Sequence, residues 1–179
     1  MASTTLGNSV QIDSLRLVKE RQVLSGSMRV AGFARLLESL PDSRGELGYR
    51  VEGDVDRQGR HLLRLQVQGA VQLLCQRCLE SYEHKVAIAT VLRLVPAAAL
   101  DSEYDDDPDE PDCVAASVAF DLAALIEDEV LLALPSYPRH EDAYCTGRAE
   151  AVAADAADSR VSAFGVLQAL RQKVIQSKE

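Results

Sequence analysis

LCQRCLE, residues 74–80, places Cys75 and Cys78 in a Cys-x-x-Cys arrangement between two stretches that have the period of β-strands. Two thiols at this spacing on a tight turn can bind one metal ion or form a disulfide with each other. The sequence therefore predicts that this turn joins two paired strands and carries the thiol chemistry of the protein.

Alternating apolar and polar side chains predict strands on both sides of this turn. Residues 45–56, 63–73 and 86–95 each have the period of a half-buried strand. Residues 56–59, DRQG, predict a turn with the glycine at a positive φ. Gly69 permits a β-bulge in the second strand, after which the alternation resumes into the cysteine turn. The strands are expected to form an antiparallel meander whose last hairpin ends at the cysteines.

Apolar residues at helical spacing predict helices over residues 33–40, 122–134 and 162–173. Asp121 is a suitable N-cap for the second of these, and Pro135 ends it. The predicted fold class is therefore α+β: an antiparallel β meander with a Cys-x-x-Cys turn, packed by two or three helices.

Length and composition favour one sizeable core, because the chain has 179 residues of which 47% are hydrophobic. Residues 1–25 are predicted to be a partly ordered N-terminal segment and residues 26–176 a single α+β domain. Within that domain residues 97–112 are rich in Asp and Glu and contain two prolines. Such a segment repels itself and cannot bury apolar surface, which predicts a disordered acidic loop.

The net charge of −9 is unevenly distributed along the chain. Residues 1–98 contain 13 basic and 10 acidic residues, whereas residues 99–179 contain 6 and 18. This balance argues against non-specific nucleic-acid binding and favours a basic partner. We find no apolar run of membrane-spanning length and no signal peptide, so we expect a cytoplasmic protein. In that compartment the four cysteines favour metal binding, redox chemistry or burial over a disulfide framework.

Three interpretations of the cysteine turn remain open from the sequence. In the first, Cys75, Cys78 and Cys145 provide three thiolates and His140 one imidazole for a structural Zn²⁺. Cys113 is an alternative to His140 as the fourth ligand, although the acidic loop is a poor place from which to fix geometry. In the second, the turn cysteines alternate between dithiol and disulfide. In the third, they only pack within the hairpin.

The sequence contains no nucleophile in a recognisable catalytic setting and no glycine-rich phosphate loop. We therefore expect a protein that is not an enzyme and has no small-molecule substrate. Glu127, Asp128 and Glu129 lie in the middle of a predicted helix and diverge around it by about 100° per residue. A solvated face is the expectation for all three, and Glu129, which lies nearest the apolar stripe, is the one that could be partly buried.

Four motifs in order resemble the YceD-like large-subunit ribosomal RNA accumulation proteins, a bacterial and plastid family. They are CQRCLE at 75–80, IEDEVLLALP at 126–135, PRH at 138–140 followed by Cys145, and FGVL at 164–167. The resemblance extends from about residue 26 to residue 173. It departs from the family pattern at position 163, where many members have a proline and this chain has alanine.

The resemblance implies a role in the accumulation or processing of large-subunit ribosomal RNA, in a family that is not known as an enzyme. In many bacteria the gene lies beside that of a small, basic, zinc-containing large-subunit ribosomal protein. One expected partner is therefore ribosomal RNA, contacted by the basic half of the chain. The other is a basic ribosomal protein, bound by the acidic half with residues 101–112 as a mimic of RNA. A thiol–disulfide redox protein that uses Cys75 and Cys78 is the alternative function. The residues considered for partner binding are Arg50, Arg64, Arg77 and Arg93 in the basic half, and Glu127, Asp128 and Glu129 in the acidic half.

Overall fold

In a computed structural model of the protein, residues 10–100, 110–140 and 145 are described. The chain divides into two compact units, Met1–His140 and Glu141–Glu179. Of the second unit only Cys145 is among the described residues. The predicted helix over residues 162–173 therefore lies outside them, as do residues 101–109 of the predicted acidic loop.

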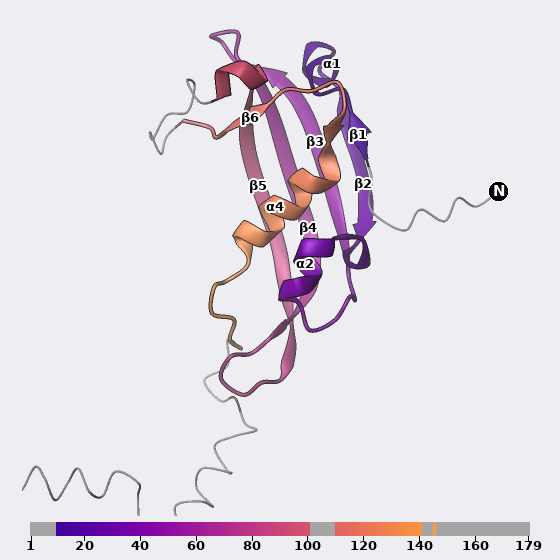
Figure 1. Ribbon diagram of the computed structural model, residues 1–179, viewed down its shortest axis with the longest axis vertical. Helices are drawn as coiled ribbons and strands as arrows, with labels where there is room; N and C mark the ends of the chain where they lie inside the picture. The colour runs from indigo at the N-terminus through magenta and orange to yellow at the C-terminus, as the bar shows by residue number, and fades with distance from the viewer. Residues whose placement is uncertain (1–9, 101–109, 141–144, 146–179) are drawn as a thin grey trace, which may run out of the picture. The chain divides into compact units, whose positions relative to one another are not determined.

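A five-stranded sheet with the order β2-β3-β4-β5-β6 forms the centre of the first unit (Figure 1). Neighbouring strands from β2 to β5 are antiparallel, whereas β6 pairs with β5 in the parallel sense. The predicted α+β meander is thus confirmed. The strands are β2 Val23–Arg29, β3 Glu46–Val55, β4 His61–Leu74, β5 Ser81–Val95 and β6 Cys113–Ala115.

β4 is continuous, and the bulge that Gly69 permits does not form. The register with β5 runs without interruption from Leu62↔Arg93 to Leu74↔Ser81. A glycine is needed at position 69 for a different reason. A Cβ there would lie 2.4 Å from the backbone oxygen of Glu46, so only glycine lets β3 approach this closely. The glycine of the β3–β4 turn, Gly59, does have the expected positive φ, of 81°.

Helices cover one face of this sheet, as Figure 1 shows for α2 and α4. Asp121 caps α4 as predicted, because its side chain accepts the backbone N–H of Ala124 at 3.0 Å. No helix of the described residues is long and apolar enough to cross a membrane. The helices are α1 Ser14–Lys19, α2 Ala34–Ser39 and α4 Leu122–Ala133, with 3₁₀ turns η1 Val30–Gly32 and η2 Ala97–Ala99. A separate ladder pairs β1 Gln11–Ile12 with β7 Phe120–Asp121.

The core lies between the sheet and these helices. Alternate residues of β4 from Leu63 to Leu73 point into it, where they meet apolar side chains of all three helices. Residues 10–25 contribute to the same core through Leu17 and Val18, which are almost completely buried. The result is one apolar layer along the sheet, with the cysteine turn at the end of the β4–β5 hairpin.

Candidate metal centre

The cysteine turn is closed by its own backbone. β4 ends at Leu74, and the N–H of Cys75 then donates to the carbonyl of Glu80 at 2.9 Å. The N–H of Leu79 donates back to the carbonyl of Cys75, also at 2.9 Å. Leu79 has a φ of 63°, in the left-handed region that reverses the chain. The N–H of Arg77 points at the Cys75 sulfur at 3.4 Å, a contact that favours a thiolate there.

The segment after α4 runs against this turn. Pro138 accepts the backbone N–H of Gln76 at 2.9 Å, and the Tyr137 hydroxyl donates to the carbonyl of Gln76 at 3.4 Å. The backbone hydrogen bond between Gln76 and Pro138 joins the two segments, and His140 therefore lies beside the cysteines although it is distant from them in the sequence. The His140 ring also packs on the ring of Tyr82, with 4.9 Å between the centroids.

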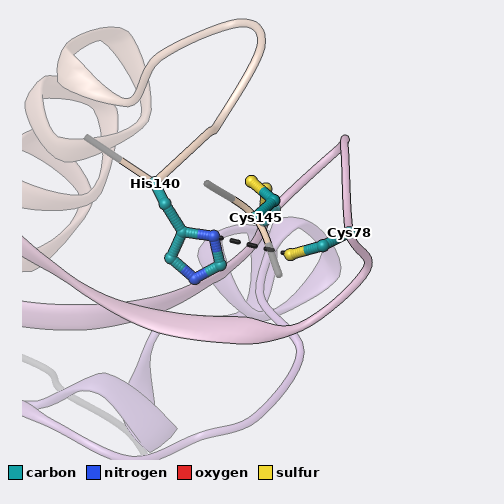
Figure 2. Close-up of side chains that lie close together, drawn as sticks. Cys78, His140 and Cys145 are labelled. Carbon is teal, nitrogen blue, oxygen red and sulfur yellow. Dashed lines mark hydrogen bonds between the residues drawn. The ribbon is translucent and has the colours of Figure 1, made fainter. Parts of the chain in front are cut away.

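Ligand atoms of Cys75, Cys78, His140 and Cys145 all lie within 4.8 Å of one another. The Cys78 sulfur is 3.5 Å from Nδ1 of His140, the contact drawn as a dashed line in Figure 2. Cys75 and Cys145 are buried, whereas Cys78 and His140 are partly exposed. None of the four cysteines of the chain forms a disulfide.

The donor set and its spacing fit a tetrahedral Zn²⁺. Zinc binds thiolate sulfur and imidazole nitrogen at about 2.0–2.3 Å, so its ligand atoms lie about 3.3–3.8 Å apart. The 3.5 Å between the Cys78 sulfur and Nδ1 of His140 falls in that range. The largest separation allowed among the four ligand atoms, 4.8 Å, exceeds the range by about an ångström. The four residues predicted from the sequence are therefore positioned to hold a metal ion.

Cys113 lies far from this cluster. It pairs with Arg93, twelve positions beyond Ser81 on β5, which corresponds to about 40 Å at the rise of a strand. Its sulfur instead contacts the Arg93 guanidinium, at 3.1 Å from Nη2. Cys113 consequently cannot replace His140 as the fourth ligand.

The environment of the turn gives little support to the redox interpretation. Cys75 is 0% exposed, so a substrate disulfide could not reach its sulfur without local opening. It also follows a strand and lies in a turn, whereas reactive Cys-x-x-Cys pairs gain from a helix N-terminus. The partly exposed sulfur, that of Cys78, faces the His140 imidazole.

The acidic residues of α4 are arranged differently from the expectation. Glu127, and not Glu129, is the most buried of the three, with 8% of its surface exposed. Its carboxylate accepts the backbone N–H groups of Arg35 and Leu36, at 2.7 and 3.0 Å. These are first-turn amides of α2, whose own N-cap residue makes no side-chain hydrogen bond. Glu127 thus caps a neighbouring helix.

The other two acids of α4 are more accessible. Asp128 pairs with the Arg35 guanidinium at 2.6 Å, and this bond, with that to Glu127, raises the pKa of Arg35. Glu129 is partly buried, as its position nearest the apolar stripe allows. Burial raises the pKa of its carboxyl, and the neighbouring charges of Asp112 and Asp128 raise it further.

Most arginines of the basic half already have partners. Arg64 pairs with Asp54 at 3.1 Å on the sheet, and Arg50 lies 3.5 Å from Glu52. Arg93 contacts Cys113 as described above. Arg77 is exposed, as Arg50 and Arg64 are, but it lies in the cysteine turn and not on the sheet. Of these four arginines, Arg77 is therefore the one placed to contact a partner at the candidate metal centre.

Sequence reasoning did not single out Tyr137 or Arg139 as candidate functional residues. The Arg139 guanidinium lies over the Tyr137 ring, 5.4 Å from its centroid, and Arg139 directly precedes the candidate ligand His140 in the sequence. The sequence YPRH, residues 137–140, matches no motif that identifies a binding site by itself. Only its position next to the candidate ligand His140 could have indicated that Tyr137 and Arg139 are functional.

The fold and the cluster define a small α+β protein with a cysteine- and histidine-lined candidate metal centre. The chain belongs to the family described as Large ribosomal RNA subunit accumulation protein YceD, whose sequence model matches residues 63–171. A relative from Haemophilus influenzae, the Large ribosomal RNA subunit accumulation protein YceD, is 29% identical over 168 residues. That match covers 90% of this chain and 95% of the relative. No solved structure matches the chain.

Proposed function

We propose that the protein is a non-enzymatic ribosome-biogenesis factor that supports the accumulation or processing of large-subunit ribosomal RNA. The main support is family membership. The relative that is named for this role aligns with 90% of this chain and with 95% of its own length. The protein acts in the cytoplasm by binding pre-ribosomal RNA or a basic large-subunit ribosomal protein. No small-molecule substrate and no membrane take part.

The same proposal includes one structural Zn²⁺ held by Cys75, Cys78, His140 and Cys145. Four protein ligands would fill the tetrahedral shell and leave no open position for a substrate, as in structural zinc sites. The burial of two ligands and the N–H that points at the Cys75 sulfur support this assignment. A bound ion would cross-link the turn to the segment after α4 without taking part in a reaction.

Charge favours different partners on different parts of the molecule. Asp112 and the mid-helix residues Asp128 and Glu129 of α4 lie close enough to interact electrostatically, and this acidic region suits a basic protein. Glu127 contributes less, because its carboxylate is occupied by α2. Arg77 and Arg139 lie at the cysteine turn, which suits RNA phosphates.

Deletion of the gene tests the cellular role. We expect the ratio of large-subunit to small-subunit ribosomal RNA to fall in the deletion strain and to return when the wild-type gene is supplied. A double variant, Cys75→Ser with Cys78→Ser, should fail to restore the ratio, whereas the matched control Cys113→Ser should succeed. An unchanged ratio in the deletion strain would show that the proposed function is wrong.

The same double variant separates the metal interpretation from the redox one. Loss of a structural metal lowers the stability of the fold as well as function. Loss of a redox pair removes function and leaves stability unchanged. A double variant that is inactive but unfolds at the wild-type urea concentration would therefore favour the thiol–disulfide alternative.

A pull-down at low salt identifies the partner. Tagged protein is recovered from a lysate with and without RNase, and the bound RNA and proteins are identified. Large-subunit RNA that disappears with its proteins on RNase treatment indicates that the factor engages pre-ribosomes through RNA. A single basic ribosomal protein that survives RNase but is released by salt indicates that the acidic region is the binding surface.

A further inference from the structure

Four exposed side chains lie on the two segments that build the candidate metal centre. Arg77 and Leu79 belong to the cysteine turn, and Tyr137 and Arg139 belong to the segment after α4. We call these four residues the knuckle surface. None of them is needed as a metal ligand, so their presence here requires a separate explanation.

The backbone beneath the knuckle surface is held firmly. The N–H of Gln76 and the carbonyl of Pro138 join the two segments at 2.9 Å. The ligands Cys78 and His140 each directly adjoin a knuckle residue in the chain and lie 3.5 Å apart. A surface supported in this way is preorganised, which lowers the entropy lost when a partner binds.

Tyr137 and Arg139 form a stacked pair on this surface. Tyr137 is 57% exposed and is the one aromatic side chain classed as exposed within the part of the chain that the structure describes. The Arg139 guanidinium covers one side of its ring at 5.4 Å. Aromatic rings and guanidinium planes are the two supports on which unpaired RNA bases stack.

Leu79 adds an apolar contact that the fold itself does not use. It is 56% exposed, so little of its side chain is buried by packing. Its φ of 63° is also unfavourable for a residue with a Cβ. Glycine or asparagine would suit this backbone better, and the exposed leucine offers a partner an apolar contact at this turn.

The charge of the surface selects the kind of partner. Residues 74–80 and 136–140 contain two arginines and one acidic residue, Glu80, in a chain whose net charge is −9. We propose that the knuckle surface binds an unpaired segment of RNA, with bases stacked on Tyr137 and Arg139 and phosphates beside Arg77. The inference rests on the proposed function and names its partner and its contact residues.

Unpaired RNA fits better than a duplex or a protein. In an A-form duplex the base faces are stacked on each other and cannot reach an aromatic side chain. A basic ribosomal protein would meet two arginines of like charge here, which disfavours it. The acidic region formed by Asp112, Asp128 and Glu129 suits such a protein better than the knuckle surface does.

Binding of ribosomal RNA fragments to the purified full-length protein tests the inference. The probe is deproteinised large-subunit ribosomal RNA, cut to short labelled fragments, measured by fluorescence anisotropy with the protein loaded with Zn²⁺. Unlabelled single strands should compete, whereas the same strands annealed to their complements should compete poorly. We expect Tyr137→Ala and Arg139→Ala each to raise the Kd by about tenfold, as for the loss of one stacked base.

Conservative and distant variants serve as controls. Tyr137→Phe keeps the ring and should bind as the wild type does, whereas Arg139→Lys keeps the charge but loses the plane and should bind weakly. Arg57→Ala removes an equally exposed arginine from the β3–β4 turn, at the opposite end of β4, and should change the Kd by no more than about twofold. The urea midpoint of each variant is compared with that of the wild type.

The outcomes that overturn the inference are distinct from failure of the proposed function. Wild-type affinity in folded Tyr137→Ala and Arg139→Ala, equal competition by duplexes, or no binding of the fragments would each overturn it. So would a protein that survives RNase in the pull-down and is lost with Tyr137→Ala, because the surface would then bind protein. The ribosomal RNA ratio in the deletion strain is measured independently and decides the proposed function alone.

Discussion

Glu127 on α4 accepts the backbone N–H of Leu36 on α2 at 3.0 Å, and so one helix supplies the N-cap that the other lacks. The same carboxylate also binds the N–H of Arg35 at 2.7 Å. This contact fixes the position of α2 beside α4 on the face of the sheet. It also explains why an acidic residue is tolerated on the buried side of a helix.

Removal of this cap should destabilise the protein. Glu127→Ala leaves two first-turn amides of α2 without a partner, and we expect the free energy of unfolding to fall by about 1–3 kcal/mol. Urea denaturation followed by circular dichroism measures the change. Asp128→Ala, which removes only an exposed ion pair with Arg35, should cost no more than about 1 kcal/mol. Equal losses for the two variants would contradict the capping role.

Zinc should bind at one ion per chain and stabilise the fold. A ligand that binds only the folded state adds about 4 kcal/mol at a thousand times its Kd, so a strong chelator should lower the unfolding free energy accordingly. Cys145→Ser and His140→Ala should lower the zinc content, measured by inductively coupled plasma mass spectrometry. Cys113→Ser is the matched control and should retain it, because that cysteine contacts Arg93 instead. A protein purified under reducing conditions with no bound zinc, whose stability does not respond to added zinc, would exclude the site.

Gly69 should not tolerate a side chain. Gly69→Ala would place a Cβ 2.4 Å from the Glu46 carbonyl and 2.8 Å from Leu47, and we expect a loss of about 1–3 kcal/mol. Gly48→Ala is the matched control, because it makes the same substitution in β3 at a position with space for a Cβ. The nearest atom to that Cβ would be the Gln68 carbonyl oxygen, at 3.6 Å. Thermal unfolding of the two variants should therefore differ. A normal melting temperature for Gly69→Ala would indicate that β3 and β4 are farther apart than described.

The pH dependence of stability should reveal Glu129. Burial raises the pKa of its carboxyl in the folded state, so the folded protein holds that proton more tightly than the unfolded chain. Ionisation above the raised pKa therefore destabilises the fold, and the penalty is relieved as the pH falls toward the ordinary value of 4.5. Glu129→Gln should be more stable than the wild type at neutral pH, with an advantage that shrinks in acid.

An exposed acid controls for the charge change in that experiment. Glu38→Gln also removes one negative charge, from the exposed surface of α2, and should change the free energy of unfolding at neutral pH by no more than about 0.5 kcal/mol. A Glu129→Gln variant that is no more stable than Glu38→Gln at neutral pH would contradict the predicted cost of burying this carboxylate.

Two expectations failed for the same reason. The helical pattern of α4 indicated Glu129 as the acid nearest the apolar stripe, but α2 packs beside α4 on the side that carries Glu127, and this contact lies outside any helical pattern. Gly69 was interpreted as permitting a bulge, since a glycine within a strand has the same sequence signature for a bulge as for a close approach. Contacts between distant segments decided both cases.

The sequence by itself determined the strands of the meander, the Asp121 cap and the cysteine turn, because these depend on side-chain periodicity and on hydrogen bonds between near neighbours. It also indicated all four candidate ligands by residue type. Only the tertiary structure decided that His140 lies beside Cys78, that Cys113 does not, and that Tyr137 and Arg139 stack on the same end of the hairpin. Those relationships depend on where α4 ends against the sheet, and that position results from packing of the whole core.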